Sequence, residues 1–139
     1  MQNPHTITVR IYYEDTDFSG VVYHARYLHF FERGRTEALR DVGIGHSELL
    51  KRDPPLVFAV REMTTRWLSP ARIDDLLTVK TEFTEASGAR IMAVQQIWRD
   101  EALLAAADVQ IVSMSVDGRP RRVPPELVSL FTARAGAAS

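Results

Sequence analysis

One segment with the period of an α-helix lies near the start of the chain, and the segments around it alternate like β-strands. Between about 26 and 42 the apolar residues share one helical face, namely Tyr27, Phe30, Phe31, Gly34, Ala38 and Val42. Alternating patterns cover about 6–13, 56–68, 77–83, 90–99 and 103–116. One helix packed on one face of a sheet is an α+β arrangement, which is the fold class that the pattern predicts.

Short turns separate the later strands, and they favour antiparallel pairing. Residues 85–88 and 100–101 leave too little chain for the crossover that parallel strands require. The prediction is therefore a first strand, a helix and a meander of about four strands. Gly34 costs roughly 1 kcal/mol in helix propensity relative to alanine, and its place on the apolar face indicates that the helix backbone approaches the sheet closely.

Length and composition indicate a single globular domain. The chain has 139 residues, of which 45% are hydrophobic and 25% charged. We expect the domain to span 1–132, with a short helix from Pro124 to about Phe131 and a frayed, disordered tail at 133–139.

Charge and cysteine content exclude several functions. The net charge of −1 argues against nucleic-acid binding, and the lack of cysteine excludes thiolate metal sites and a cysteine nucleophile. No apolar run approaches the ~20 residues that span a membrane. The first residues lack the basic region and apolar stretch that are typical of a secretory signal. We expect a cytoplasmic location.

The segment 12–24 concentrates three carboxylates, a Ser-Gly bend and a histidine ahead of the predicted helix. A carboxylate, an imidazole and free backbone N–H groups can together attack a carbonyl and stabilise the resulting oxyanion. If the first strand persists, Asp15 and Asp17 point to one side and Glu14 to the other. The alternative is a charged strand end followed by a turn and a helix cap.

This segment also resembles a known family. Asp15-Thr16-Asp17, Gly20-Val21-Val22-Tyr23-His24 and the continuation Phe30-Phe31-Glu32-Arg33-Gly34-Arg35-Thr36-Glu37 are similar to hotdog-fold acyl-CoA thioesterases of the 4-hydroxybenzoyl-CoA thioesterase family. The likeness is strongest to the Tol-Pal-associated branch. It extends through 57–63 and 70–75 and fades after about Asp117. It implies one hotdog domain, in which a curved antiparallel sheet of about five strands wraps a long central helix.

The resemblance implies roles for two side chains. Asp17 matches the catalytic aspartate of the family, which attacks the thioester directly or activates a water. His24 matches a histidine proposed to assist catalysis in the Tol-Pal branch, whereas the 4-hydroxybenzoyl branch has an aromatic residue there. That difference favours a short aliphatic acyl group. Without the resemblance, the sequence pattern indicates that Asp17 is a capping residue and His24 a surface residue.

Backbone groups and further side chains complete the predicted site. The N–H groups of Val22, Tyr23 and His24 lie at the expected helix start, where unpaired donors and the helix dipole favour an oxyanion. Other residues are candidates for substrate contact. They are Tyr13 and Tyr23 for the acyl group, Gly20 in the bend, and Arg90 or the group Arg119, Arg121 and Arg122 for the phosphates of coenzyme A. Core aromatics and solvated surface arginines are the alternatives. Ion pairing on the helix surface explains Glu32 and Glu37.

The predicted partners follow from the same reading. The histidines lack the spacing of a zinc site, so neither a metal nor a cofactor is expected, and coenzyme A enters only as part of the substrate. Open sheet edges and the resemblance predict a homo-oligomer, a dimer or a tetramer. Two alternatives stay open. The first is a thioesterase acting on acyl carrier protein. The second is a non-catalytic acyl-CoA-binding or scaffold protein of the Tol-Pal or phospholipid-synthesis machinery.

Overall fold

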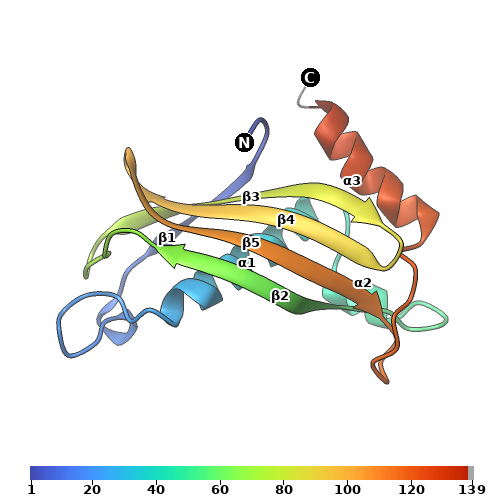
Figure 1. Ribbon diagram of the computed structural model, residues 1–139, viewed down its shortest axis with the longest axis horizontal. Coiled ribbons are helices and arrows are strands. Elements are labelled where there is room, and N and C mark those ends of the chain that lie inside the picture. The colour runs from blue at the N-terminus through green and yellow to red at the C-terminus, as the bar shows by residue number, and fades with distance from the viewer. Residues whose placement is uncertain (138–139) are drawn as a thin grey trace.

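The computed structural model describes residues 1–137, which form a five-stranded antiparallel sheet with helices on its face and at its ends (Figure 1). The elements in chain order are β1 (His5–Arg10), the 3-10 helix η1 (Tyr13–Asp15), α1 (Arg26–Asp41), α2 (His46–Leu50), β2 (Val57–Trp67), β3 (Leu76–Ser87), β4 (Arg90–Arg99), β5 (Ala102–Met114) and α3 (Pro125–Ala137).

The sheet order is β1-β3-β4-β5-β2, and every neighbouring pair is antiparallel. The predicted meander is confirmed for β3, β4 and β5, which follow one another through short turns. It is wrong for β2, which lies at the far edge and pairs only with β5. The connection 68–75 is long enough to carry the chain across the sheet to β3, and the alternating pattern of β2 gave no indication of which strand would be its neighbour.

Three boundaries differ from the prediction. β1 ends at Arg10, because the carboxylate of Asp15 accepts the Tyr12 N–H and helps to close η1. The strand alternation predicted for Asp15 and Asp17 therefore does not exist. α2 was not predicted, and α3 continues to Ala137 instead of ending near Phe131. The end of the predicted tail, residues 138–139, lies outside the described residues, and the domain limit at 132 stays a prediction.

The predicted apolar face of α1 packs against the sheet. Tyr27, Phe30, Phe31, Gly34 and Ala38 are buried, and the helix contacts β1, β3 and β4. The prediction of a long central helix is not confirmed, because α1 has 16 residues and lies mainly over β1 and β3, toward one side of the sheet.

Gly34 has the role that its position predicted. A Cβ atom there would lie 2.8 Å from Val79 Cγ1 and 2.9 Å from Thr81 Oγ1. Below it, the buried Gln95 amide donates to the Phe31 carbonyl at 2.9 Å and to Thr81 Oγ1 at 2.8 Å. The bare backbone at Gly34 lets α1 pack closely onto β3 and β4.

Candidate active site

The loop that precedes α1 closes on itself. The Asp17 N–H donates to the Val21 carbonyl at 2.9 Å, and the Gly20 N–H donates to the Asp17 carbonyl at 3.0 Å. Gly20 has a φ of 83°, a left-handed conformation that glycine adopts without the Cβ strain of other residues. An isolated bridge joins Thr16 to Val22. The loop therefore presents Asp17 as the first residue of a hydrogen-bonded turn.

The Asp17 carboxylate is exposed and holds a defined orientation. Its Oδ1 accepts hydrogen bonds from the Ser19 hydroxyl at 2.5 Å and from the Ser19 N–H at 2.9 Å. The Ser19 hydroxyl, followed by backbone N–H donors, lowers the pKa of Asp17 below its ordinary value of 3.8. At neutral pH the carboxylate is ionised, which suits a nucleophile or a general base.

A second carboxylate anchors this loop to α1. Asp15 is 5% exposed, and its Oδ1 accepts from Arg26 Nε at 2.9 Å and from Arg26 Nη2 at 2.6 Å. The other oxygen accepts the Tyr12 N–H at 2.9 Å, and the Asp15 carbonyl accepts the Tyr23 N–H at 2.9 Å. Asp15 and Arg26 thus tie both strands of the loop to the first turn of the helix.

The imidazole of His24 contacts two aromatic rings. The Tyr23 ring is 4.5 Å away, centroid to centroid, and the Trp67 ring meets it edge-on at 5.9 Å. The indole N–H of Trp67 also donates to the His24 carbonyl at 3.1 Å. Within the described chain, no hydrogen bond or ion pair joins His24 to Asp17. The Asp17 carboxylate turns toward Ser19, and the Asp17 backbone pairs with Val21.

Beside His24 lies a cleft of about 270 Å³, lined by Val22, His24, Tyr27, Trp67, Leu68, Ser69 and Pro70. The Tyr27 hydroxyl accepts the Ala71 N–H at 3.0 Å, and burial raises the pKa of this phenol. Neither Trp67 nor Leu68 was predicted to line the site. The local signal was a large apolar pair directly before the Ser69-Pro70 strand stop, where a strand end meets a turn.

Two of the three predicted oxyanion donors are already engaged. The Val22 N–H donates to the Ala71 carbonyl at 2.8 Å and the Tyr23 N–H to the Asp15 carbonyl at 2.9 Å. This corrects the prediction that both are free, because α1 begins only at Arg26 and the residues before it are bonded as loop. Among the described residues, the His24 N–H has no backbone acceptor and is the remaining candidate donor.

Arg90, a predicted contact with coenzyme A, lies far from this cleft within one chain. Arg90 pairs with Glu85 at 3.8 Å and opens β4, whereas the Trp67 end of the sheet lies level with Ile97. The offset of 97 − 90 = 7 residues corresponds to about 23 Å along a strand. Tyr13 is exposed on η1, and Tyr23 is exposed beside His24.

Comparison with known proteins identifies the family. A family model described as the thioesterase-like superfamily matches residues 11–131. The chain belongs to the thioesterase-like superfamily. The matched range contains the loop, α1, all of β2 to β5 and most of α3, so the whole site described above lies within this thioesterase-like domain.

Individual relatives agree with this membership. The acyl-CoA thioesterase YbgC of Haemophilus influenzae is 41% identical over 132 residues, which cover 94% of this chain and 96% of the relative. The crystal structure of a probable thioesterase from Bartonella henselae superposes with a TM-score of 0.84 at 47% identity and covers 87% of this chain and 99% of its own. A 4-hydroxybenzoyl CoA thioesterase mutant complexed with 4-hydroxybenzoyl CoA has a TM-score of 0.86 at 19% identity, covering 93% and 99%, and shows the shared fold alone. The family resemblance and the hotdog-type fold are confirmed.

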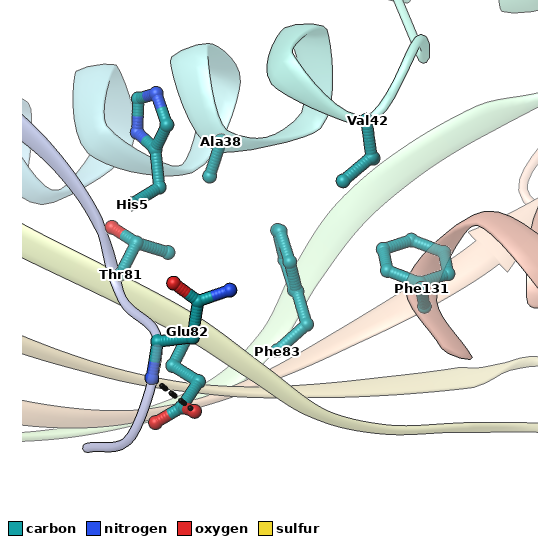
Figure 2. Close-up of a pocket in the computed structure, with 8 residues that line it drawn as sticks. His5, Ala38, Val42, Thr81, Glu82, Phe83 and Phe131 are labelled. Carbon is teal, nitrogen blue, oxygen red and sulfur yellow. Dashed lines mark hydrogen bonds between the residues drawn. The ribbon is translucent and has the colours of Figure 1, made fainter. Parts of the chain in front are cut away.

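A second hollow, at the other end of α1, is too small for an acyl group. It has about 20 Å³, room for one water molecule. Figure 2 shows Phe83 and Phe131 beside Ala38 and Val42, with Thr81, Glu82 and His5 around the polar part. The described residues hold no group of three or more histidines and carboxylates arranged for a metal ion, and none of their helices combines the length and apolar character needed to cross a membrane.

Proposed function

We propose that this protein is an acyl-CoA thioesterase that hydrolyses the thioester to a free acid and coenzyme A. The observation that carries the proposal is Asp17, an exposed and ionised carboxylate that opens a closed turn and is oriented by Ser19. The similarity to the Haemophilus influenzae acyl-CoA thioesterase supports the substrate class.

The reaction can follow either of two routes from this geometry. In one, the Asp17 carboxylate attacks the thioester carbonyl carbon, and water then hydrolyses the acyl-enzyme anhydride. In the other, Asp17 takes a proton from water as the water attacks. Both routes place negative charge on the carbonyl oxygen, toward which the His24 N–H is the available donor. The C–S bond breaks, the coenzyme A thiolate takes up a proton, and the His24 imidazole assists this transfer.

A short aliphatic acyl group suits the cleft beside His24. Its lining is mostly apolar, with no charged carboxylate or guanidinium, and its volume of about 270 Å³ is below the ~300–1,000 Å³ of pockets for drug-sized ligands. The match of His24 to the Tol-Pal branch supports the same substrate. No resident cofactor or metal enters the proposal, and the proposed location is the cytoplasm.

The active form that we propose is a homodimer, with a tetramer as the further assembly. β2 is an open edge of the sheet, and pairing two copies of it antiparallel across a two-fold axis would remove that edge. Because Arg90 lies level with the Val57 end of β2, this pairing would carry the Arg90 end of one subunit toward the Trp67 end of the other. Sedimentation at micromolar concentration tests the assembly, and a monomer would contradict it.

Thiol release from short, long and aromatic acyl-CoAs tests the function. Wild type and Asp17→Asn are compared side by side, with His29→Ala on the exposed face of α1 as control. The loss of a general base or nucleophile is expected to lower kcat by about 10²–10⁴-fold. Unchanged hydrolysis by Asp17→Asn would contradict the proposed role.

Two further measurements test the alternatives, namely hydrolysis of acyl groups on acyl carrier protein and binding of acyl-CoA. Faster hydrolysis of an acyl group carried on acyl carrier protein would identify that carrier as the substrate. Tight binding of acyl-CoA without turnover on either carrier would favour a non-catalytic binding or scaffold role.

A further inference from the structure

We propose that Trp67 positions His24 and sets the length of the acyl group that the cleft accepts. This inference rests on the proposed thioesterase function and deepens it. Trp67 is the last residue of β2, and 43 positions separate it from His24 in the sequence. The two meet because β2 runs along the far edge of the sheet and ends beside the loop that leads into α1.

Two contacts tie Trp67 to His24. The indole N–H donates to the His24 carbonyl at 3.1 Å, and the indole ring meets the imidazole edge-on at 5.9 Å. Tyr23 contacts the imidazole at 4.5 Å. One hydrogen bond holds the His24 backbone, and two aromatic rings contact its exposed imidazole, which favours the rotamer that makes these contacts. The same bond fixes the peptide plane after His24, next to the N–H that is the proposed oxyanion donor.

Trp67 also forms one wall of the cleft. Trp67 pairs across the sheet with Ala105 of β5, and the small side chain of Ala105 fills little of the space beside the indole. The large apolar residue after it, Leu68, lines the cleft as well, and Trp67 itself is 45% exposed. Large apolar side chains left exposed around a cleft mark surface that a ligand or a partner subunit covers. Removing the indole would therefore enlarge the cleft, and replacing it with a ring of similar size would not.

The other tryptophan of the chain has none of these features. Trp98 lies on β4, its indole N–H donates to the Gln96 side chain at 3.0 Å, and the Lys80 ammonium lies 5.0 Å from its ring centroid. It lines no part of the cleft beside His24. Trp98→Phe is therefore a matched control for substitutions of Trp67.

Hydrolysis rates for saturated acyl-CoAs of increasing chain length provide the first test. Trp67→Ala is expected to raise KM for the shortest substrates by about tenfold and to move the preferred length upward, since each methylene that a pocket contacts contributes ~10-fold or more to selectivity. Trp67→Phe keeps the wall but loses the donor, so kcat is expected to fall several-fold with KM and preferred length unchanged. Trp98→Phe is expected to match wild type. A wild-type length preference in Trp67→Ala would overturn the specificity role, and unchanged kcat in Trp67→Phe would overturn the positioning role.

Fluorescence provides a test that does not depend on turnover. The chain has two tryptophans, so a protein carrying Trp98→Phe and Asp17→Asn reports only on Trp67 and does not consume its ligand. Titration with butyryl-CoA is expected to change the Trp67 emission saturably, and coenzyme A alone is expected to change it much less. Binding detected by calorimetry with no change in Trp67 emission would overturn the inference. If wild type hydrolyses no thioester at all, the proposed function fails instead, so the two failures are distinguishable.

Discussion

The two ends of α1 meet their surroundings differently. At its N-terminal end, the loop that carries the ionised carboxylate of Asp17 leaves the Phe18 ring exposed, and the Trp67 ring beside His24 is also partly exposed. At its C-terminal end, Phe83 and Phe131 contact each other at 5.0 Å and leave a hollow of only about 20 Å³ (Figure 2). The same residue types close the fold at one end and remain open for a ligand at the other.

The difference shows that the burial of an apolar residue predicts whether it contributes to stability or to ligand binding. Apolar surface removed from water contributes to the free energy of unfolding, whereas exposed apolar surface is available to bind. Substitutions at the closed end should therefore lower stability and spare chemistry. Substitutions at the open end should do the reverse, except where a buried ion pair holds the loop.

The largest effect on stability is expected for Phe131→Ala. Phe131 is 6% exposed, and truncating a buried phenylalanine typically costs about 3–5 kcal/mol of unfolding free energy. The matched change at the open end, Phe18→Ala, removes a ring that is 108% exposed and is expected to cost within about 0.5 kcal/mol. Urea unfolding followed by circular dichroism measures both. An equal loss in Phe18→Ala would show that this ring is covered in solution and would break the comparison.

Arg26→Ala tests whether the ion pair between Arg26 and Asp15 stabilises the loop at the open end of α1. It leaves Asp15 buried without its partner, at a cost of about 2–3 kcal/mol, less than for a fully buried pair because the Arg26 side chain is 29% exposed. Arg40→Ala breaks the exposed pair with Glu37 on the same helix and should cost less than about 1 kcal/mol. Thermal or urea unfolding compares the two. Equal losses of unfolding free energy in the two variants would mean that the Asp15–Arg26 pair stabilises the fold no more than an exposed ion pair does.

Gly34→Ala tests the contact midway between the two ends. Its Cβ would lie 2.8 Å from Val79 Cγ1, and the overpacking should outweigh the gain of about 1 kcal/mol in helix propensity, for a net loss of about 1–2 kcal/mol. His29→Ala, at an exposed position of α1, gains propensity without the clash. Greater stability in Gly34→Ala, measured by urea unfolding, would show that α1 can lift from the sheet without cost.

Ser19→Ala should have the smallest effect, visible only in acid. Ser19 lowers the pKa of Asp17 below 3.8, and Asp17 must be ionised to act, so activity is lost as pH falls through this depressed pKa. Removing the hydroxyl should move the acid limb of kcat/KM to higher pH, toward 3.8, with little change at pH 7. Ser47→Ala is the control, and circular dichroism at each pH confirms that the protein is folded. An acid limb unmoved by Ser19→Ala would contradict the assignment of that limb to Asp17.

The amino-acid sequence by itself determined the local structure and the family. The helical period of Tyr27 to Ala38 predicted the buried face of α1, the position of Gly34 predicted its close approach to the sheet, and Arg90–Arg99 was predicted with the limits that β4 has. Periodicity reports local geometry and burial together, which is why these predictions succeeded.

The tertiary structure alone decided which distant segments meet. Only the sheet order places β2 at the far edge, where Trp67 contacts His24. Only the folded loop shows that the N–H groups of Val22 and Tyr23 donate to the carbonyls of Ala71 and Asp15. Alternating side chains show which face of a strand is buried but not which strand lies beside it. That choice depends on long-range pairing and on where each backbone donor finds its acceptor.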